Sequence, residues 1–384
     1  MVTGIVLILA CIIFEWQDPA LHGQVEDHFR RGVELQQRGD LVGAERAYQT
    51  ALSLNPDRAD ILSNLGVVSA RLGRYEEAVA HYQRALKLRP QEVRIRLNLG
   101  IAHYQLRQHR QVISQLSQVA ELLPDHTQTR LLLGLSHYEL GELDDAIRQL
   151  ESVYAAEPRN TTVAHLLALA YLDSGEPTRI DRAGELARTV FGHLSSAEAC
   201  LVRGTYALKR RDAETAISNL REALRLNPGL SAARSRLGAA WLLAGNREAA
   251  VTVYAEELTA NPGNLEVASR LGWLYREEGR LDEAAPLLKQ ALEQRPNDPG
   301  LLYQLARLYY TRRQLTEALS LAERLITLAP SYRPGRVFLS RLYFRMGRLM
   351  DARREKLVLA RLTSDQLRRP VSSETSNPLL NHQQ

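Results

Sequence analysis

The sequence predicts an all-α protein, a solenoid of about ten helix-turn-helix repeats. Leucine, glycine and alanine recur at fixed places along the chain, and a further glycine recurs near the middle of each period. Prolines mark the period of 34 residues, at Pro56, Pro90, Pro124 and Pro158 and again at Pro228, Pro262, Pro296 and Pro330. A constant period of this length is typical of an array in which each repeat packs against its neighbours.

Each repeat is predicted to hold two antiparallel helices. Counted so that the proline is position 32, the repeats begin at residues 25, 59, 93, 127, 161, 197, 231, 265, 299 and 333. Position 7 is leucine in most repeats, as in Leu65, and fills the seam between the helices. Position 8 is most often glycine, as in Gly66, and position 20 is most often alanine, as in Ala78. These small residues allow the two helices to approach closely.

The end of each helix also has a signal. Glycine at position 15, as in Gly73, ends the first helix with a positive φ, and proline at position 32 ends the second helix. Arginine replaces this glycine at Arg107, Arg211 and Arg313, so we expect those turns to be looser or differently capped. The fifth repeat carries a two-residue insertion, and we expect a longer interhelical loop around Pro177.

These repeated positions resemble the tetratricopeptide repeat family. The segment ADILSNLGVVSARLGRYEEAVAHYQRALKLRP, residues 59–90, matches its motif closely. The resemblance covers residues 25–366 and implies a right-handed superhelix. Residues 1–24 are interpreted as an apolar signal-like or anchor segment followed by a linker. Residues 367–384 are interpreted as a disordered polar tail. The aromatic residue that is usual at position 4 of the family motif is missing. Several repeats carry arginine there instead, as at Arg96 and Arg336.

The sequence argues against catalysis. It contains no P-loop, GxGxxG, HExxH or GxSxG motif. The two cysteines, Cys11 and Cys200, lie too far apart in the sequence for a CxxC metal site. His103 and His137 share position 11 of adjacent repeats, about 10 Å apart, which is too far for one zinc ion. We therefore expect no enzyme activity, no cofactor and no metal.

The resemblance implies that first helices line a concave groove through positions 2, 5, 6, 9, 12 and 13. Position 6 is asparagine in the second and third repeats, and an asparagine amide can both donate to and accept from a peptide backbone. Position 6 is arginine in the first, seventh and eighth repeats, and positions 9, 12 and 13 add further arginines late in the chain. The predicted partner-binding residues are Arg30, Asn64, Asn98, Arg236, Arg270, Arg276, Arg307, Arg341 and Arg345.

The charge distribution indicates the kind of partner. The chain carries a net charge of +5, and residues 331–364 alone hold eight Arg and one Lys against Asp351 and Glu355. Arginine pairs well with carboxylates, so we expect a protein or peptide partner with acidic segments, and a non-catalytic scaffold or adaptor function. For Arg348, Arg353 and Arg354 we favour a solubilising cap over ligand binding, and for Arg341 and Arg345 we favour a ligand.

Two other functions stay open. One is an accessory module of an enzyme complex, such as a glycosyltransferase or an envelope biosynthesis complex. The other is binding of an anionic polymer through the basic C-terminal end. A nucleic-acid site is disfavoured, because the groove arginines do not alternate regularly with aromatic residues in the sequence.

The N-terminal run from Gly4 to Phe14 bears on location. It is apolar over eleven residues, shorter than the roughly 20 that a membrane-spanning helix needs. The run resembles the core of a secretory signal, and Ile8–Cys11 resembles a lipoprotein box in which Cys11 is lipidated. A signal, a weak membrane anchor and an apolar arm packed on the array all stay open. We expect an exported, periplasmic or membrane-associated protein, with a cytoplasmic scaffold as the alternative.

Overall fold

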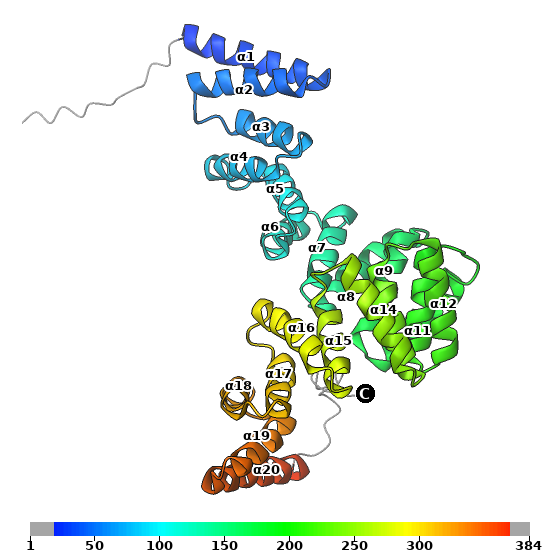
Figure 1. Ribbon diagram of the computed structural model, residues 1–384. Helices are drawn as coiled ribbons and strands as arrows, with labels where there is room; N and C mark the ends of the chain where they lie inside the picture. The colour runs from blue at the N-terminus through cyan, green and yellow to red at the C-terminus, as the bar shows by residue number, and fades with distance from the viewer. Residues whose placement is uncertain (1–18, 369–384) are drawn as a thin grey trace, which may run out of the picture. The chain divides into compact units, whose positions relative to one another are not determined.

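The computed structural model describes residues 19–368, which form twenty α-helices and no strands (Figure 1). The chain divides into two compact bodies, an N-terminal body of residues 1–186 and a C-terminal body of residues 187–384, and each is described by itself. The apolar run Gly4–Phe14, the lipidation candidate Cys11 and residues 369–384 of the predicted tail lie outside the described residues, whereas residues 367–368 of that tail are helical. The predicted all-α solenoid of ten helix pairs is confirmed.

The helices alternate between first and second members of a repeat. Those that begin in the N-terminal body are α1 (Pro19–Gln37), α2 (Leu41–Leu54), α3 (Ala59–Arg71), α4 (Tyr75–Leu88), α5 (Val93–Gln105), α6 (His109–Leu122), α7 (Thr127–Glu139), α8 (Leu143–Ala156), α9 (Thr161–Ser174) and α10 (Pro177–Thr189). Those of the C-terminal body are α11 (Ala197–Lys209), α12 (Ala213–Leu226), α13 (Ser231–Leu243), α14 (Arg247–Ala260), α15 (Leu265–Glu277), α16 (Leu281–Gln294), α17 (Pro299–Thr311), α18 (Leu315–Leu328), α19 (Arg333–Arg345) and α20 (Leu349–Arg368).

Within each body the helices pack in chain order (Figure 1). In the N-terminal body α3 packs on α4 and α4 on α5, and in the C-terminal body α17 packs on α18 and α18 on α19. The leucines at position 7 and the alanines at position 20 are buried, as Leu65 and Ala78 illustrate. The core is therefore a continuous seam between neighbouring helices within each body, as expected for a repeat array.

Glycine at position 8 makes room for a large side chain on the second helix. A Cβ added at Gly66 would lie 2.5 Å from Cε1 of Tyr82, and one added at Gly272 would lie 2.8 Å from Cγ of Leu288. Real Cβ atoms do not come this close, so only glycine fits without displacing the ring or the leucine. The two helices therefore approach closely, as predicted, where the glycine at position 8 of the first helix contacts the large side chain at position 24 of the second.

The turn between the helices has the predicted left-handed residue. Gly73 has φ of +78°, and the other position-15 glycines are similar. Arg107, Arg211 and Arg313 adopt the same conformation, with φ of 55°, 62° and 62°. The three turns keep the geometry of the glycine turns rather than becoming looser, and they place an L-residue where glycine is favoured.

The two-residue insertion of the fifth repeat lies elsewhere than predicted. We expected a longer loop around Pro177, but only Gly175 and Glu176 separate α9 from α10, and Pro177 is the first residue of α10. Proline is well accommodated at this position, because its missing N–H has no partner in the first turn of a helix. The extra length follows the second helix instead, in the connection from residue 190 to 196.

Arginine at position 4 has a structural role. Nη2 of Arg96 donates to the carbonyl oxygen of Pro90 at 2.6 Å, and Nε of Arg336 donates to that of Pro330 at 2.5 Å. Nη1 of Arg336 also donates to Glu355 at 2.6 Å. The arginine therefore ties the proline loop that precedes its helix to the second helix of its own repeat. This contact replaces the packing of the family's usual aromatic residue.

The two end helices exceed the predicted repeat boundaries. Helix α1 begins at Pro19, so residues 19–24, predicted to belong to a linker, are helical. Helix α20 continues to Arg368, beyond residue 366, where the predicted array ends. Among the described residues, no helix combines the length and the apolar character that a membrane crossing requires.

Candidate functional site

The first helices α17 and α19 of the C-terminal body carry a cluster of tyrosine, phenylalanine and arginine side chains. The rings of Tyr303 and Phe338 meet edge to face at a centroid distance of 5.9 Å, and those of Tyr310 and Phe338 at 5.6 Å. Arg307 lies 5.7 Å from the centroid of Tyr303, and Arg345 lies 5.1 Å from that of Tyr310. We call these five residues the arginine–tyrosine cluster.

Aromatic contact is favourable for these arginines, because the face of a tyrosine ring attracts a cation. Nη1 of Arg345 is also 3.3 Å from the hydroxyl oxygen of Tyr310. Aromatic rings thus accompany two of the predicted groove arginines. The sequence shows no regular alternation of arginine with aromatic residues, and the expectation that nucleic acid is not the ligand stays a prediction.

Arg276, predicted as a groove arginine, is instead buried, with an exposed fraction of 7%. Its Nη2 lies 2.7 Å from Oε1 of Glu277 and donates to Oε1 of Gln304 at 3.0 Å. Burial lowers the pKa of Arg276, and the positive charge of Arg307 lowers it further. Arg276 therefore joins α15 to α17, and Arg307 lies 3.7 Å from the same carboxylate of Glu277.

Arg341 and Arg345 differ from the other arginines of the last repeat. Both side chains are exposed, and neither forms an ion pair with any residue that the structure describes. Arg348 and Arg354, by contrast, pair with Asp351 at 2.8 and 3.4 Å. The sequence favoured a ligand for Arg341 and Arg345 and a solubilising cap for Arg348, Arg353 and Arg354, and both roles stay predictions.

An exposed apolar residue accompanies the two free arginines. Phe344, on the same helix α19, has an exposed fraction of 68%. The groove position 12 that it occupies in its repeat is filled by Tyr310 in the repeat before. The end of the first-helix surface therefore combines unpaired cations with an accessible ring.

Arg236 and Arg270 contact their own helices. Nη1 of Arg236 lies 3.4 Å from the carbonyl oxygen of Ala232, and Nη2 of Arg270 pairs with Glu266 at 2.9 Å. Neither contact joins these two predicted residues to the arginine–tyrosine cluster. Both remain predicted site residues, half-buried on α13 and α15.

The remaining predicted residues belong to the N-terminal body. Arg30 is exposed on α1 and lies 3.7 Å from Asp27. Asn64 on α3 is half-buried, and the hydroxyl of Tyr48 donates to Oε1 of Gln36 at 2.8 Å, while burial raises the pKa of Tyr48 to about 12. Asn98 is half-buried at the equivalent place on α5. The two asparagines share a face of consecutive first helices, as the repeat period predicts.

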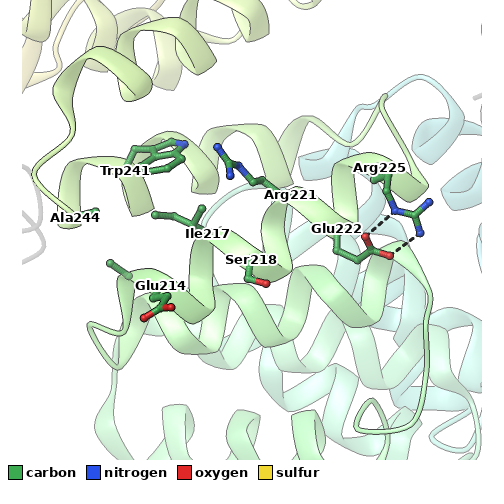
Figure 2. Close-up of a pocket in the computed structure, with 9 residues that line it drawn as sticks. Glu214, Ile217, Ser218, Arg221, Glu222, Arg225, Trp241 and Ala244 are labelled. Carbon is green, nitrogen blue, oxygen red and sulfur yellow. Dashed lines mark hydrogen bonds and ion pairs between the residues drawn. The ribbon is translucent and has the colours of Figure 1, made fainter.

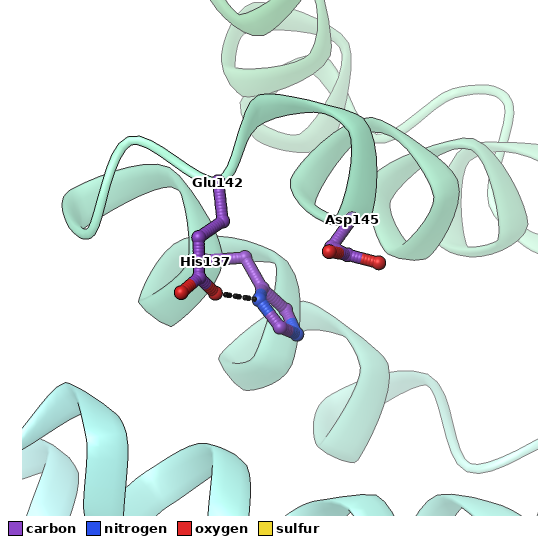
Figure 3. Close-up of side chains that lie close together, drawn as sticks. All are labelled: His137, Glu142 and Asp145. Atoms are coloured by element: carbon purple, nitrogen blue, oxygen red, sulfur yellow. Dashed lines mark hydrogen bonds and ion pairs between the residues drawn. The ribbon is translucent and has the colours of Figure 1, made fainter.

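A histidine and two carboxylates in the N-terminal body come close enough to bind a metal ion (Figure 3). His137, Glu142 and Asp145 have ligand atoms within 4.8 Å of one another, and Nδ1 of His137 lies 2.7 Å from Oε2 of Glu142. The same two positions meet in the preceding repeat, where His103 contacts Gln108 at 2.6 Å. Because an amide replaces the carboxylate there, the pairing is explained by the helical hairpin itself.

The tyrosines of the cluster were not among the residues predicted from the sequence. Tyr303 is at position 5 and Tyr310 at position 12, both of which the family resemblance assigns to the groove. Phe338 is at position 6 of the last repeat, which is also a groove position. The signal that could have identified the cluster is the presence of aromatic residues at groove positions 5, 6 and 12 of the last two repeats, which a search for charged residues alone does not detect.

Two models of the tetratricopeptide repeat match residues 29–93, 131–179 and 201–264 and residues 275–326. A model of the anaphase-promoting complex, cyclosome, subunit 3 matches residues 71–153. The tetratricopeptide matches together cover more than half of the chain, and this chain belongs to the tetratricopeptide repeat family. No curated protein matches the sequence.

Solved structures with a similar fold were also found. MamA from Desulfovibrio magneticus RS-1, residue 41 to the end, is 21% identical, with a TM-score of 0.43, and the match covers 44% of this chain and 96% of MamA. A MamA RS-1 ArsTM double mutant gives the same values. A monomeric mutant of IFIT1 with Gppp-AAAA is 14% identical, with a TM-score of 0.51, over 88% of this chain and 90% of IFIT1. The likeness to IFIT1 supports the fold alone.

Proposed function

We propose that this protein is a non-catalytic scaffold that holds an extended acidic segment of a partner protein on the first helices α17 and α19. Tetratricopeptide arrays act in general as protein-interaction scaffolds. The observation that carries the proposal for an acidic partner is that Arg341 and Arg345 are exposed on the first-helix surface without a carboxylate. Their charges are available to a ligand without loss of an internal ion pair.

The chemistry of these side chains favours carboxylates. A guanidinium donates two parallel hydrogen bonds to a carboxylate, and such charged pairs are stronger than neutral ones. The ring of Tyr310 supports Arg345 and reduces the side-chain freedom that binding would otherwise remove. Phe344 offers an apolar contact beside the charges. We therefore expect a partner segment with acidic residues near an apolar residue.

A charge-reversal pair tests this proposal. We expect Arg341→Glu/Arg345→Glu to weaken binding of a fluorescein-labelled acidic peptide, selected from an array of Asp- and Glu-containing sequences, at least tenfold. The matched control is Arg353→Glu/Arg354→Glu on α20, which changes the net charge equally. Affinity is measured by fluorescence polarisation, and circular dichroism checks the fold. Equal losses in both variants would show a response to net charge and would contradict the proposal.

An anionic polymer is the second candidate for the same end of the array. The contacts of Arg307 and Arg345 with tyrosine rings favour it, because aromatic–arginine surfaces also suit nucleic acids. Salt separates the two candidates. Polymer binding releases counterions and falls steeply between 50 and 200 mM salt. A peptide complex with few charged pairs and an apolar contact is expected to lose much less affinity over the same range.

We also propose that Asn64 and Asn98 clamp the backbone of a bound peptide. The two asparagines occupy the same position of consecutive first helices, which supports this clamp.

We propose in addition that the protein is exported or associated with a membrane through its N-terminal segment. The apolar run Gly4–Phe14 supports export. Fractionation of cells that produce the full chain and a variant without residues 1–18 tests the location. A full chain found only in the cytoplasmic fraction favours the alternative location.

The accessory-module alternative also predicts a measurable difference. If the array serves an enzyme complex, the purified chain alone is inactive, but the activity of the complex depends on it. We favour the simpler scaffold because the resemblance to the family accounts for nearly the whole described chain. Co-purification of a stoichiometric enzyme subunit would favour the module instead.

A further inference from the structure

The C-terminal body has an open cavity that shares no residue with the proposed site on α17 and α19. It has a volume of about 1080 Å³ and lies between α12 and the end of α13 (Figure 2). Its lining includes Ala213, Ile217 and Arg221 from α12 and Trp241 and Ala244 from α13 and its C-cap. Figure 2 shows the side chains of Ile217 and Trp241 in the space between the two helices.

The sequence explains why a cavity forms at this joint. Ala213 is at position 17 of the sixth repeat and Ala244 at position 14 of the seventh. At the corresponding joint between the last two repeats these positions are Leu315 and Met346, and both pack against one core cluster. Two alanines at the same joint leave the space of two large side chains empty. Among the repeats described here, only the α12–α13 joint has alanine at both positions.

The chemistry of the lining is that of a site for an apolar side chain. The indole of Trp241 and the side chain of Ile217 provide the apolar wall, and both are half-buried. The guanidinium of Arg221 lies 4.9 Å from the centroid of the indole ring and forms no ion pair with any described residue. The neighbouring Arg225, in contrast, is held by Glu222 at 2.7 Å. Arg221 is therefore a free cation at the rim of an apolar pocket.

We propose that this cavity is a second docking site, for a partner peptide that inserts one bulky apolar side chain beside the indole and pairs a neighbouring carboxylate with Arg221. Protein interfaces concentrate their binding energy where a large side chain fills a pocket on the other surface. The guanidinium of Arg221, beside the indole, supplies the complementarity for an acidic neighbour, whereas the exposed carboxylate of Glu214, which also lines the cavity, disfavours an acidic residue at its own position. The open shape suits a side chain presented by a peptide, with the peptide backbone outside the cavity.

To test this proposal, larger side chains are introduced that occupy the cavity. The variant Ala213→Leu/Ala244→Met installs the residues of the α18–α19 joint, so it is expected to fold with equal or higher thermal stability. Ala244 has right-handed backbone angles, φ −74° and ψ −3°, which methionine adopts without strain. The probe is a phage-displayed library of random twelve-residue peptides, selected on the wild-type protein. Recovered peptides are then synthesised and their affinities measured by fluorescence polarisation.

The proposal makes three linked predictions about these peptides. They contain a bulky apolar residue within two positions of Asp or Glu, they bind the filled variant at least tenfold more weakly, and they bind Arg221→Glu more weakly as well. They bind Arg341→Glu/Arg345→Glu like the wild type, which separates this site from the one on α17 and α19. Failure to recover peptides that depend on the open cavity, or equal affinity for the filled variant, would overturn the proposal.

Discussion

Single residues at the interhelical turns show where the chain departs from the conformation its repeat requires. Seven turns use glycine with positive φ, and Arg107, Arg211 and Arg313 adopt the same conformation. The arginine side chains are exposed. Their left-handed backbone conformation therefore destabilises the folded protein by roughly 1–2 kcal/mol per residue, and no ion pair of these side chains with a described residue offsets that cost.

We expect Arg107→Gly, Arg211→Gly and Arg313→Gly each to stabilise the protein by about 0.5–1 kcal/mol. Relief of the positive-φ strain exceeds the added freedom that glycine gives the unfolded chain. Urea denaturation followed by circular dichroism measures the change. Gly73→Ala is the converse control, since its Cβ would meet no atom within 4 Å and only the backbone penalty remains. A more stable Gly73→Ala variant would contradict this account.

Glycine at position 8 acts through space rather than through φ. We expect Gly66→Ala to destabilise the protein by about 1–3 kcal/mol, because the new Cβ overlaps the buried ring of Tyr82. Gly23→Ala on α1 is the control, since nothing lies within 4 Å of its Cβ and alanine favours the helix. Thermal melts of both variants give the comparison. Equal melting temperatures for the two would show that the hairpin tolerates the extra methyl group.

At the scale of the element, the α13–α14 hairpin is held by a buried carboxylate. Glu257 has no exposed surface and occupies position 27, where most repeats have alanine, valine or leucine. It accepts hydrogen bonds from Arg234 at 2.7 Å and Asn264 at 2.9 Å. Ser231 donates to it as well. Burial alone would raise the pKa of Glu257, but these donors hold it below the usual range.

We expect Glu257→Ala to cost about 3–5 kcal/mol, because it leaves the partly buried Arg234 without its carboxylate. The double variant Arg234→Ala/Glu257→Ala should recover most of that loss. It reproduces the combination of Ala268 and Ala291 in the next repeat, both of which are buried. Denaturant titrations of the two variants and the wild type supply the free energies. A double variant as unstable as the single one would show that Arg234 is not the source of the cost.

The same carboxylate predicts a pH dependence. Since the folded-state pKa of Glu257 is below the unfolded value of about 4.3, its contribution to stability is complete above that value and is lost as the pH falls through the folded pKa. The stability difference between wild type and Glu257→Gln should therefore shrink as the pH drops below about 4. Unfolding titrations at pH 7, 5, 4 and 3 measure it. A difference that is constant over this range would contradict the depressed pKa.

The helices and turns could be predicted from the sequence wherever the residue type at a repeat position has only one structural explanation. Leu65 and Ala78 recur at helical spacing and are buried, and Gly73 has the positive φ that its position requires. The insertion could not be placed, because Pro177 suits the first turn of a helix as well as a loop. The role of Arg336 also escaped prediction, since its partner Glu355 lies on the other helix of the hairpin.

The candidate site was predicted less completely, because the contacts between its side chains cannot be read from the repeat period. The period identifies which residues share the first-helix surface, but not which of them pair with one another. Arg276 is buried by Gln304, a residue of the next repeat, and Arg307 contacts the ring of Tyr303 on its own helix. Such contacts depend on side-chain directions. Charge counts alone therefore could not separate Arg276 from the exposed Arg341.

At the scale of the whole molecule, the chain is an array whose helices pack chiefly on those next to them in sequence. Stability in such an array is a sum of repeat and neighbour terms, and the terminal repeats have a neighbour on one side only. Within each body we therefore expect graded hydrogen exchange. Amides of α19 and α20 should exchange faster than those of α15 and α16, as measured by mass spectrometry of peptic fragments. Uniform protection across the C-terminal body would indicate a single cooperative unit.

The central claim is that the first-helix surface of α17 and α19 holds the partner. The most direct test is photo-crosslinking in the source cells, with benzoylphenylalanine placed at Phe344 on α19 or at Leu328 on α18, two exposed apolar positions on different helices. We expect a crosslinked partner from position 344, greatly reduced by Arg341→Glu/Arg345→Glu, and little from position 328. Equal crosslinking from both positions, or a yield from position 344 that survives charge reversal, would contradict the account.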